Sequence, residues 1–267
     1  MAIEFIKMHG LGNDFVFIDQ GSLKTDLSHE LITKICDRRL GLGCDQLILY
    51  RRLADKSYLM EIYNTDGSRA GMCGNASRCL ALYAYEKYQE DALEIMAGSR
   101  LISAVVDSEN VIAVNMGQAL FTRSWMPQIN EFSSIISDYG LSSKEMVFVD
   151  VGNKHVVIFY DSLSKQEKTL LGQAFQKHVL LNEGVNVDFA KIDQGIIHLE
   201  VFERGVGFTM ACGSGACATF AAARKLQFAL NNAIIRFKIG DLHMSYSRQN
   251  IIMSGPAIKV ATGHYYG

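Results

Sequence analysis

The sequence has 267 residues, of which 49 % are hydrophobic and 20 % charged, so it encodes globular structure and not a largely disordered chain. The formal net charge of −2 and the lack of Lys/Arg-rich runs argue against nucleic-acid and membrane-surface partners. No apolar stretch approaches the roughly 20 residues of a membrane span, and residues 1–10 have no signal-peptide pattern. We therefore expect a cytoplasmic protein whose six cysteines are reduced.

Patterns of apolar residues predict the elements of the first half of the chain. Strands are expected at residues 4–8, 15–19, 47–50, 58–63, 93–97, 101–106 and 111–116. A helix is expected from the N-cap Ser28 to Arg38, and a second over residues 74–88. The second helix is apolar nearly all round, so it should be buried on every side. Turns are expected at Gly98 and at residues 108–110.

The second half is predicted to follow the same order. Its strands are expected at residues 147–151, 156–160, 185–189 and 197–202, its helices at 167–178 and 213–230, with three more strands after them. Residues 118–130 form the expected linker. Because strands are not regularly followed by crossover helices, a doubly wound parallel sheet is disfavoured. The predicted fold class is α+β, with a curled, mostly antiparallel sheet wrapped around a central helix in each half.

Short motifs recur about 140 residues apart, which predicts an internal duplication. The pairs are Gly12-Asn13 with Gly152-Asn153, Asp45-Gln46 with Val185-Asn186, Asn64 with Glu203, and Cys73-Gly74 with Cys212-Gly213. We expect two pseudo-symmetric domains, residues 1–117 and 118–256, with the last strand, 257–267, returning to the first domain. Since the paired positions match in place but differ in side chain, we expect one site between the halves with a cysteine on each side.

Each repeated cysteine precedes small residues at the first turn of a predicted helix. The free backbone N–H groups of such a turn can hold a carboxylate and stabilise the negative charge that builds when the adjacent carbon loses a proton. A helix N-terminus also favours the thiolate form of a cysteine, whose usual pKa is about 8.5. Cys73 and Cys212 are thus candidates for an acid/base pair that inverts a carbon centre. The alternative is that they are buried structural cysteines, the interpretation we favour for Cys36, Cys44, Cys79 and Cys217.

Motifs along nearly the whole chain resemble those of the diaminopimelate epimerase family. They are Lys7 to Phe15, Gly43 to Gln46, Asn64 to Ser68, Cys73 to Asn75, Asn115 to Gly117, Gly152-Asn153, Asn186-Val187, Glu203 to Gly205, Ala211 to Ala218 and Gly255 to Ala257. Each motif alone is weak, but their order and spacing are specific. The resemblance implies an isomerase that interconverts LL- and meso-diaminopimelate in lysine and peptidoglycan precursor biosynthesis, needs no cofactor or metal, acts on a small amino acid and forms a homodimer.

The resemblance also assigns roles to individual residues. Cys73 and Cys212 would be the catalytic pair, and His155 would support the reacting centre. The expected substrate-binding residues are Asn13, Gln46, Asn64, Gly74, Asn75, Asn153, Asn186, Glu203, Arg204, Gly213 and Ser214. The guanidinium of Arg204 suits a second carboxylate. Other interpretations stay open: Arg204 as a surface cation, His155 as a structural histidine, and the asparagines as turn formers beside glycine.

Three departures from the usual motifs stand out. Ala76-Ser77 replaces Gly-Ala after the first cysteine, Lys154 stands where the family has proline, and Phe208 replaces a glutamate. Two rival functions are kept: a related cofactor-independent racemase of another amino acid, such as proline or histidine, and a thiol-redox or metal-binding protein. A pyridoxal-phosphate racemase and a dinucleotide-binding protein are disfavoured, because no lysine stands out and the glycine fingerprint is incomplete.

Overall fold

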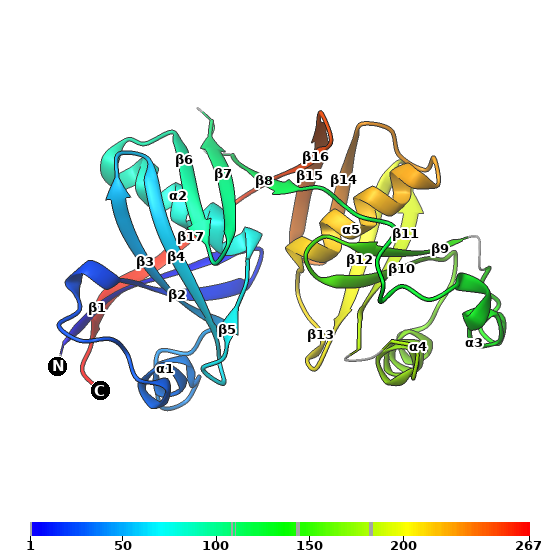
Figure 1. Ribbon diagram of the computed structural model, residues 1–267, viewed down its shortest axis with the longest axis horizontal. Helices are drawn as coiled ribbons and strands as arrows, with labels where there is room; N and C mark the ends of the chain where they lie inside the picture. Colours follow the sequence, from blue (N-terminus) through cyan, green and yellow to red (C-terminus); the bar gives the residue numbers. More distant parts are fainter. Residues whose placement is uncertain (1, 108, 110, 143–144, 182–183) are drawn as a thin grey trace. The chain divides into compact units, whose positions relative to one another are not determined.

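The computed structural model describes residues 2–107, 109, 111–142, 145–181 and 184–267. The chain divides into two compact units (Figure 1). Unit 1 consists of Met1–Asn115 and Ser254–Gly267, and unit 2 of Met116–Met253. Among the described residues, no helix has the length and apolar character needed to cross a membrane.

Unit 1 is a sheet curled around helix α2 (Gly74–Tyr88), whose residues from Gly74 to Ala84 are buried. The strands are β1 (Ile3–Gly10), β2 (Asn13–Asp19), β3 (Gln46–Ala54), β4 (Ser57–Asn64), β5 (Arg69–Ala70), β6 (Ala92–Ala97), β7 (Arg100–Val106), β8 (Ile112–Gly117) and β17 (Ile258–Tyr265). Helix α2 contacts β1, β6, β7 and β17. Strand β17 pairs antiparallel with β1, so the C-terminal segment completes this unit. Helix α1 (His29–Cys36) is short and amphipathic, and a 3-10 turn, η1 (Gln20–Ser22), follows β2.

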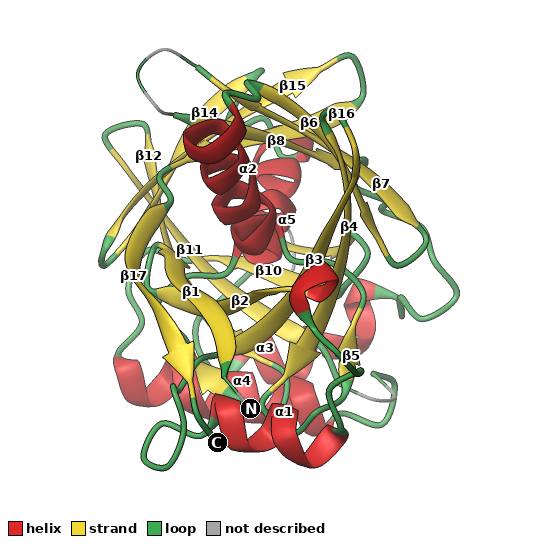
Figure 2. Ribbon diagram, turned by 90° about the vertical axis from the view of Figure 1, so that its left-hand side faces the viewer, coloured by secondary structure: helices red, strands yellow, loops and turns green. Residues whose placement is uncertain are grey.

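Unit 2 repeats this plan around helix α5 (Gly213–Lys225), which is buried from Gly215 to Ala223. Its strands are β9 (Met146–Asp150), β10 (Lys154–Phe159), β11 (Asn186–Asp193), β12 (Ile196–Glu203), β13 (Gly207–Phe208), β14 (Asn232–Phe237), β15 (Gly240–Ser247) and β16 (Asn250–Gly255). Helix α4 (Lys165–Lys177) packs on β11, and its N-terminus has a capping box made by Ser164 and Glu167. Figure 2 shows α2 and α5 as red helices within yellow strands.

Strand register confirms the duplicated fold. In unit 1, β2 runs parallel to β3 with Phe15 opposite Gln46. In unit 2, β10 runs parallel to β11 with His155 opposite Asn186, the corresponding pair of positions. Strands β3 with β4 and β11 with β12 are antiparallel, and β4 with β6 and β12 with β14 are parallel. The predicted fold class, an α+β fold made twice around central helices, is therefore correct.

Two predicted helix ends were wrong. Helix α1 ends at Cys36 and not at Arg38, because Asp37 is extended and its carboxylate accepts the N–H groups of Arg39 and Leu40 in a new turn. Helix α5 ends at Lys225 and not at residue 230. There Gln227 has a left-handed φ of 64°, and the next N–H bonds back to Ala223 O at 2.8 Å, as in a Schellman-type ending. The predicted turn at 108–110 includes residues 108 and 110, which lie outside the described residues.

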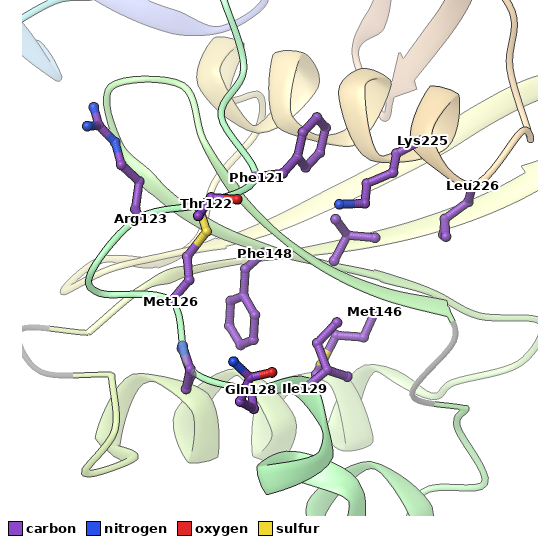
Figure 3. A pocket seen from close by; sticks show the side chains of 12 residues that line it. Phe121, Thr122, Arg123, Met126, Gln128, Ile129, Met146, Phe148, Lys225 and Leu226 are labelled. Carbon is purple, nitrogen blue, oxygen red and sulfur yellow. The ribbon is translucent and has the colours of Figure 1, made fainter.

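The predicted linker, residues 118–130, leads into a short turn and helix that were not predicted, η2 (Ile129–Phe132) and α3 (Ser133–Ser137). Phe132 belongs to the core of unit 2 and stacks on Phe175 with ring centroids 5.3 Å apart. A cavity of about 380 Å³ lies beside this segment (Figure 3), with Lys225 extended over the ring of Phe121. None of the predicted site residues lines this cavity.

Candidate active site

The two repeated cysteines occupy the same structural position in their units. Cys73 is the N-cap of α2 with φ −141° and ψ 110°, and Cys212 is the N-cap of α5 with φ −132° and ψ 113°. Both are in extended conformation, so each side chain stands beside the first helical turn. The first amides of each helix, including those of Gly74, Asn75, Gly213 and Ser214, precede the first i to i−4 bond and are available to an anion.

In unit 1, Asn13 is the side chain that links the cysteine to its surroundings. Its Oδ1 accepts a hydrogen bond from Asn75 Nδ2 at 3.1 Å and lies 3.8 Å from Cys73 Sγ. Asn75 is in turn held by Arg78, which is fully buried and donates to Asn75 Oδ1 at 2.9 Å. Gly10 leaves room for this packing, since a Cβ there would lie 3.0 Å from the guanidinium of Arg78.

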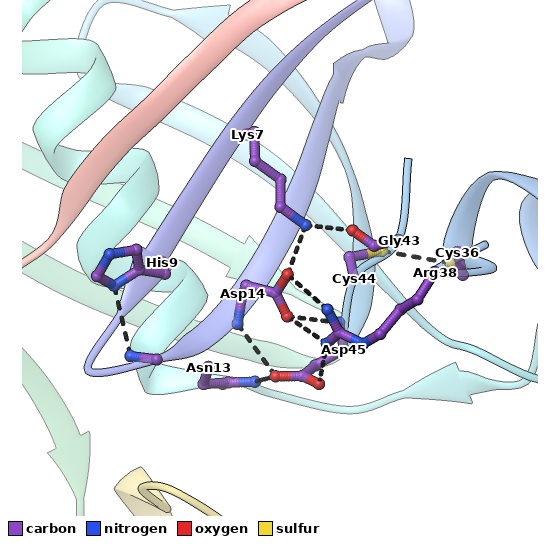
Figure 4. A network of polar contacts seen from close by, with 10 residues as sticks. Lys7, His9, Asn13, Asp14, Cys36, Arg38, Gly43, Cys44 and Asp45 are labelled. Carbon is purple, nitrogen blue, oxygen red and sulfur yellow. Dashed lines mark hydrogen bonds and ion pairs between the residues drawn. The ribbon is translucent and has the colours of Figure 1, made fainter. Parts of the chain in front are cut away.

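A charged network fixes the other side of Asn13 (Figure 4). Asp45 accepts from Asn13 Nδ2 at 3.0 Å and from the backbone N–H of Asp14 at 3.1 Å. Arg38 bridges the two carboxylates with contacts of 2.7 Å to each, and Lys7 pairs with Asp14. The orientation of the Asn13 amide is therefore set by an anion on one side and Asn75 on the other.

Gln46 and Asn64 form a second polar pair in unit 1. They are opposite each other on β3 and β4, and Gln46 Nε2 donates to Asn64 Oδ1 at 3.0 Å. Asn64 donates in turn to Ser68 Oγ at 3.0 Å. The structure thus brings Asn13, Asn75 and Cys73 into contact and places Gln46 and Asn64 together at the ends of the neighbouring strands.

In unit 2, Cys212 is surrounded by hydrogen-bonding groups. Its Sγ accepts from the N–H of Gly215 at 3.4 Å and lies 3.4 Å from Ser214 Oγ. Gly215 permits a close approach of α5 to the sheet, because a Cβ there would lie 2.8 Å from Val201 and 3.0 Å from Asp188 Oδ1. Asn153 Nδ2 also donates to Ser214 Oγ, at 3.4 Å.

His155 is fully buried and contacts polar groups with both ring nitrogens. Its Nδ1 lies 2.9 Å and 3.1 Å from the two carboxylate oxygens of Asp188, which is also fully buried. Its Nε2 lies 3.1 Å from Ser214 Oγ and 3.4 Å from Asn186 Nδ2. His155 is therefore joined to Cys212 through a single hydroxyl.

Asn186 and the Glu203-Arg204 pair lie at the adjacent strand ends. Asn186 Oδ1 accepts from the backbone N–H of Arg204 at 2.9 Å, and its Nδ2 donates to Lys154 O at 3.1 Å. The carboxylate of Glu203 accepts from Thr209 Oγ1 at 2.5 Å. Arg204 directly follows the last residue of β12 and is exposed.

The pKa of Cys212 corrects one expectation from the sequence. A helix N-terminus was expected to favour the thiolate, but burial raises the pKa of this thiol well above its usual value, and the carboxylates of Glu203 and Asp188 raise it further. The hydrogen bonds that Cys212 makes with Ser214 and Gly215 act in the opposite direction without overcoming this. Burial likewise raises the pKa of the Glu203 and Asp188 carboxyls, and His155 opposes the rise in both.

The structure shows the surroundings of the three departures from the family motifs. Ala76 lies inside α2 and is fully buried, and its counterpart in the repeat is Gly215, where Asp188 and Val201 leave no room for a Cβ. Phe208 packs edge-on against Phe202, with ring centroids 5.1 Å apart, and joins the core of unit 2. Lys154 has its ammonium 5.9 Å from the centre of the Trp125 ring.

Asp45 and Asp188 are functional candidates that the sequence analysis did not name. Asp45 stood inside a repeated motif, so its position next to Gln46 was available as a signal. Asp188 follows Asn186 by two residues on β11, on the face opposite Val187 and Phe189, and it is buried because both faces of the strand are covered from residue 187 to residue 190. A carboxylate at a core position needs a partner, and the sequence alone did not identify His155 as that partner.

The other cysteines are buried. Cys36 and Cys44 lie in the core of unit 1 with their sulfurs 3.5 Å apart, and Cys79 and Cys217 lie inside the central helices with no exposed surface. Among the described residues, no cluster of three or more His, Cys, Asp or Glu side chains has the arrangement of a metal site.

Comparison with solved structures finds the same fold in other proteins. A phenazine biosynthesis protein of the PhzF family from Bacillus anthracis superimposes with a TM-score of 0.74 at 14 % identity, covering 99 % of both chains. A hydroxyproline epimerase from Agrobacterium vitis superimposes with a TM-score of 0.65 at 13 % identity, covering 98 % of this chain and 90 % of the other. At these identities the similarity defines the fold class.

Sequence comparison identifies the family. The diaminopimelate epimerase model matches residues 5–122 and 147–260. The chain is 45 % identical to the diaminopimelate epimerase of Rickettsia prowazekii (strain Madrid E), over 99 % of this chain and 97 % of that one. It is 46 % identical to that of Rickettsia bellii (strain OSU 85-389), with 99 % and 98 % covered. The chain belongs to the diaminopimelate epimerase family.

Proposed function

We propose that this protein is an isomerase that interconverts LL- and meso-diaminopimelate by two-base proton transfer, with Cys73 and Cys212 as the acid/base pair. The observation that carries the proposal is the equivalence of the two thiols, each the N-cap of the buried central helix of its repeat. Membership of the diaminopimelate epimerase family supports the choice of substrate. Structural cysteines that only filled space in the core would have no reason to recur at this position of both repeats.

In the proposed reaction, the thiolate of one cysteine removes the α-proton from one face, and the thiol of the other donates its proton to the opposite face. The roles exchange in the reverse direction. The amides of Gly74, Asn75, Gly213 and Ser214 would hold the adjacent carboxylate and stabilise the charge that develops on it. No electron sink is needed in this scheme, so we expect activity to survive dialysis against chelator and hydroxylamine.

The remaining predicted residues would bind the two ends of the diamino diacid. Glu203 would offset a substrate ammonium, and Arg204 would bind the distal carboxylate through two parallel hydrogen bonds. Asn13, Gln46, Asn64, Asn153 and Asn186 would supply the other polar contacts, and His155 would support the reacting centre. The rival function, racemisation of an amino acid such as proline or histidine, has no use for this second polar set.

We further propose that the enzyme works in the cytoplasm, in lysine and peptidoglycan precursor biosynthesis, and that it is a homodimer. The dimer proposal draws support from β17, whose residues from Ile258 onward are mostly exposed and include Ile258 and Val260, 49 % and 58 % exposed. Exposed apolar side chains that lie together on one strand are suited to contact with a second copy. Sedimentation velocity over a range of concentrations tests it, and a monomer at micromolar protein would contradict it.

The central test uses Cys73→Ser and Cys212→Ser in deuterated water with LL-diaminopimelate. A serine hydroxyl is far too weak an acid and base to replace a thiol near neutral pH, so each variant should lose net epimerisation. Cys79→Ala and Cys217→Ala, which remove buried thiols from the same helices, serve as controls and should retain turnover. Near-normal activity in either serine variant would refute the two-base assignment, and preferred exchange into L-proline or L-histidine would favour the rival racemase.

A further inference from the structure

A continuous chain of hydrogen bonds inside unit 2 leads from a buried carboxylate to the candidate thiol. Asp188 contacts His155 Nδ1 at 2.9 Å, His155 Nε2 contacts Ser214 Oγ at 3.1 Å, and Ser214 Oγ contacts Cys212 Sγ at 3.4 Å. Asp188 and His155 are both without exposed surface. Burying a carboxylate costs free energy unless the carboxylate is paired and hydrogen-bonded, and the His155 imidazole is the partner of Asp188.

The surrounding backbone determines which nitrogen of His155 carries the proton. The amide of Asn186 is oriented by two backbone partners: its oxygen accepts from Arg204 N–H, and its nitrogen donates to Lys154 O. The group that faces His155 Nε2 is therefore the Asn186 NH₂, a donor, 3.4 Å away. Nε2 must then be an acceptor, so the neutral ring carries its proton on Nδ1 and donates it to the Asp188 carboxylate.

This tautomer sets the direction of the other two bonds. With Nε2 as acceptor, the hydroxyl of Ser214 donates to His155 and has a lone pair facing Cys212. The Cys212 S–H can then donate to Ser214. These hydrogen bonds are thus arranged to carry a proton away from the sulfur of Cys212 and toward the imidazole of His155.

The first repeat has no counterpart of this chain among the described residues. The positions that correspond to His155 and Asp188 are Phe15 and Ile48, both fully buried and apolar. The duplication therefore supplied the same backbone twice, while only unit 2 carries a buried imidazole and carboxylate behind its cysteine. The polar pair is not a general requirement of the fold.

We propose that Asp188 is a positioning residue that acts through His155 and Ser214 to let Cys212 become a thiolate. In the step proposed, the Cys212 S–H bond breaks as its proton passes to Ser214 Oγ, and the hydroxyl proton of Ser214 passes to His155 Nε2. The products are a thiolate and an imidazolium, and the Asp188 carboxylate stabilises the imidazolium. The proposal deepens the proposed function and rests on it only in taking Cys212 as one of the two acid/base groups.

Two other effects act on the same thiol and must be separated from this one. Glu203 faces Cys212 from β12, and its charge, like that of Asp188, opposes formation of the thiolate. If Asp188 acted on Cys212 only through space, its neutralisation would make the thiolate easier to form. If it acts through His155, neutralisation removes the partner of the imidazolium and makes the thiolate harder to form. The two models predict opposite signs.

The test measures the rate of iodoacetamide alkylation at Cys212 from pH 5 to 10, without substrate, by peptide mass spectrometry. Asp188→Asn should slow alkylation at pH 7 at least tenfold and shift its midpoint to higher pH. Ser214→Ala should do the same, and adding Asp188→Asn to it should cause no further loss, because the connection is already broken. Thr219→Val, which removes another buried hydroxyl of α5 that has no hydrogen-bond partner among the described residues, is the matched control and should leave the profile unchanged.

Unchanged or faster alkylation in Asp188→Asn would overturn the proposal, as would additive effects in the double variant. A second measurement needs no variant of the buried carboxylate: ¹⁵N NMR of labelled histidine in the wild-type protein should show His155 protonated at Nδ1, and protonation at Nε2 alone would contradict the argument. Failure of the proposed function is separate. If Cys212→Ser still epimerises diaminopimelate while the alkylation results hold, the catalytic assignment of Cys212 is wrong. The proposed relay from Asp188 through His155 and Ser214 to Cys212 would still be supported.

Discussion

Replacement of Asp45 tests whether Asn13 must be held in one orientation for catalysis. Asp45 does not belong to the predicted set of substrate-binding residues, yet its carboxylate accepts from Asn13 Nδ2 at 3.0 Å. Asn13 in turn contacts Asn75 and the thiol of Cys73 through its Oδ1. In Asp45→Ala the amide loses the anion that fixes it and can rotate, so the contact with the helix N-terminus is weakened.

The size of the effect follows from the geometry. A hydrogen bond to a charged acceptor is worth about 1.5–3 kcal/mol. The side chain of Asp45 is 44 % exposed, so water replaces part of the lost interaction, and about 1–2 kcal/mol remains. At one decade for each ~1.4 kcal/mol, kcat/KM for diaminopimelate should fall roughly 5- to 30-fold. Asp45→Asn, which keeps one acceptor oxygen without the charge, should fall between wild type and Asp45→Ala.

The assay is the initial rate of epimerisation, with urea unfolding run on the same preparations. Asp55→Ala is the matched control: Asp55 also pairs with an arginine, Arg52 at 2.7 Å, but its side chain is 94 % exposed, and among the described residues its hydrogen bond is to Arg52 and not to a candidate residue. We expect the control to stay within twofold of wild type. If Asp45→Ala also stays within twofold, or if both variants lose activity equally, Asn13 is not oriented by Asp45 and this reasoning fails.

Three further outcomes follow from individual contacts. Arg204→Lys should lower kcat/KM for diaminopimelate at least roughly tenfold while leaving slow α-proton exchange of monocarboxylic amino acids unchanged, because lysine cannot form two parallel hydrogen bonds; equal loss on every substrate would contradict a role in specificity. Burial raises the pKa of Asp14, but hydrogen bonds from Arg38 and Lys7 outweigh this and bring it from 3.8 to about 2. The contacts of the Asp14 carboxylate with Arg38 and Lys7 therefore stabilise the fold above about pH 4, and this stability is lost as pH falls through about 2. In urea titrations, Asp14→Asn should lower the free energy of unfolding by about 1–2 kcal/mol at pH 7 after solvent screening and by almost nothing near pH 2. A difference between wild type and variant that does not narrow on acidification would refute this. Gly215→Ala should destabilise the protein by about 1–3 kcal/mol in the same titrations, since its Cβ would lie 2.8 Å from Val201, and a neutral change would show that α5 can shift.

Periodicity and repetition predicted the strands and the central helices because these depend on local patterns of apolar residues. The helix over residues 74–88 was predicted to its ends. The end of α5 was not, because residues 226–230 are helix-compatible and apolar except for Gln227, whose left-handed φ stops the helix. A glutamine gives no local signal of that conformation, unlike the glycine that usually occupies such a position.

The candidate site was likewise predictable in part: most of its residues were, and the electrostatics of Cys212 were not. Motif spacing was enough to nominate the cysteines and asparagines, since each motif is a local feature of the chain. The electrostatics of Cys212 were not predictable, because they depend on Glu203 and Asp188, which come from strands distant in sequence and become neighbours only in the folded sheet. A helix N-terminus favours a thiolate, but two nearby carboxylates and burial favour the thiol.

The balance between thiol and thiolate at each cysteine depends on side chains that differ between the two repeats. A two-base reaction uses one thiol as the base and the other as the acid, and the environment of each thiol sets how readily it takes either role. The duplicated backbone supplies two equivalent helix N-termini, and the side chains behind them then differ: Phe15 and Ile48 in unit 1, His155 and Asp188 in unit 2. In the proposed relay, the side chains at these buried sheet positions change the acidity of Cys212, while Cys73 and Cys212 keep the same N-cap backbone conformation. Such positions are where divergence between the repeats can tune the proposed pair while both helices keep their geometry.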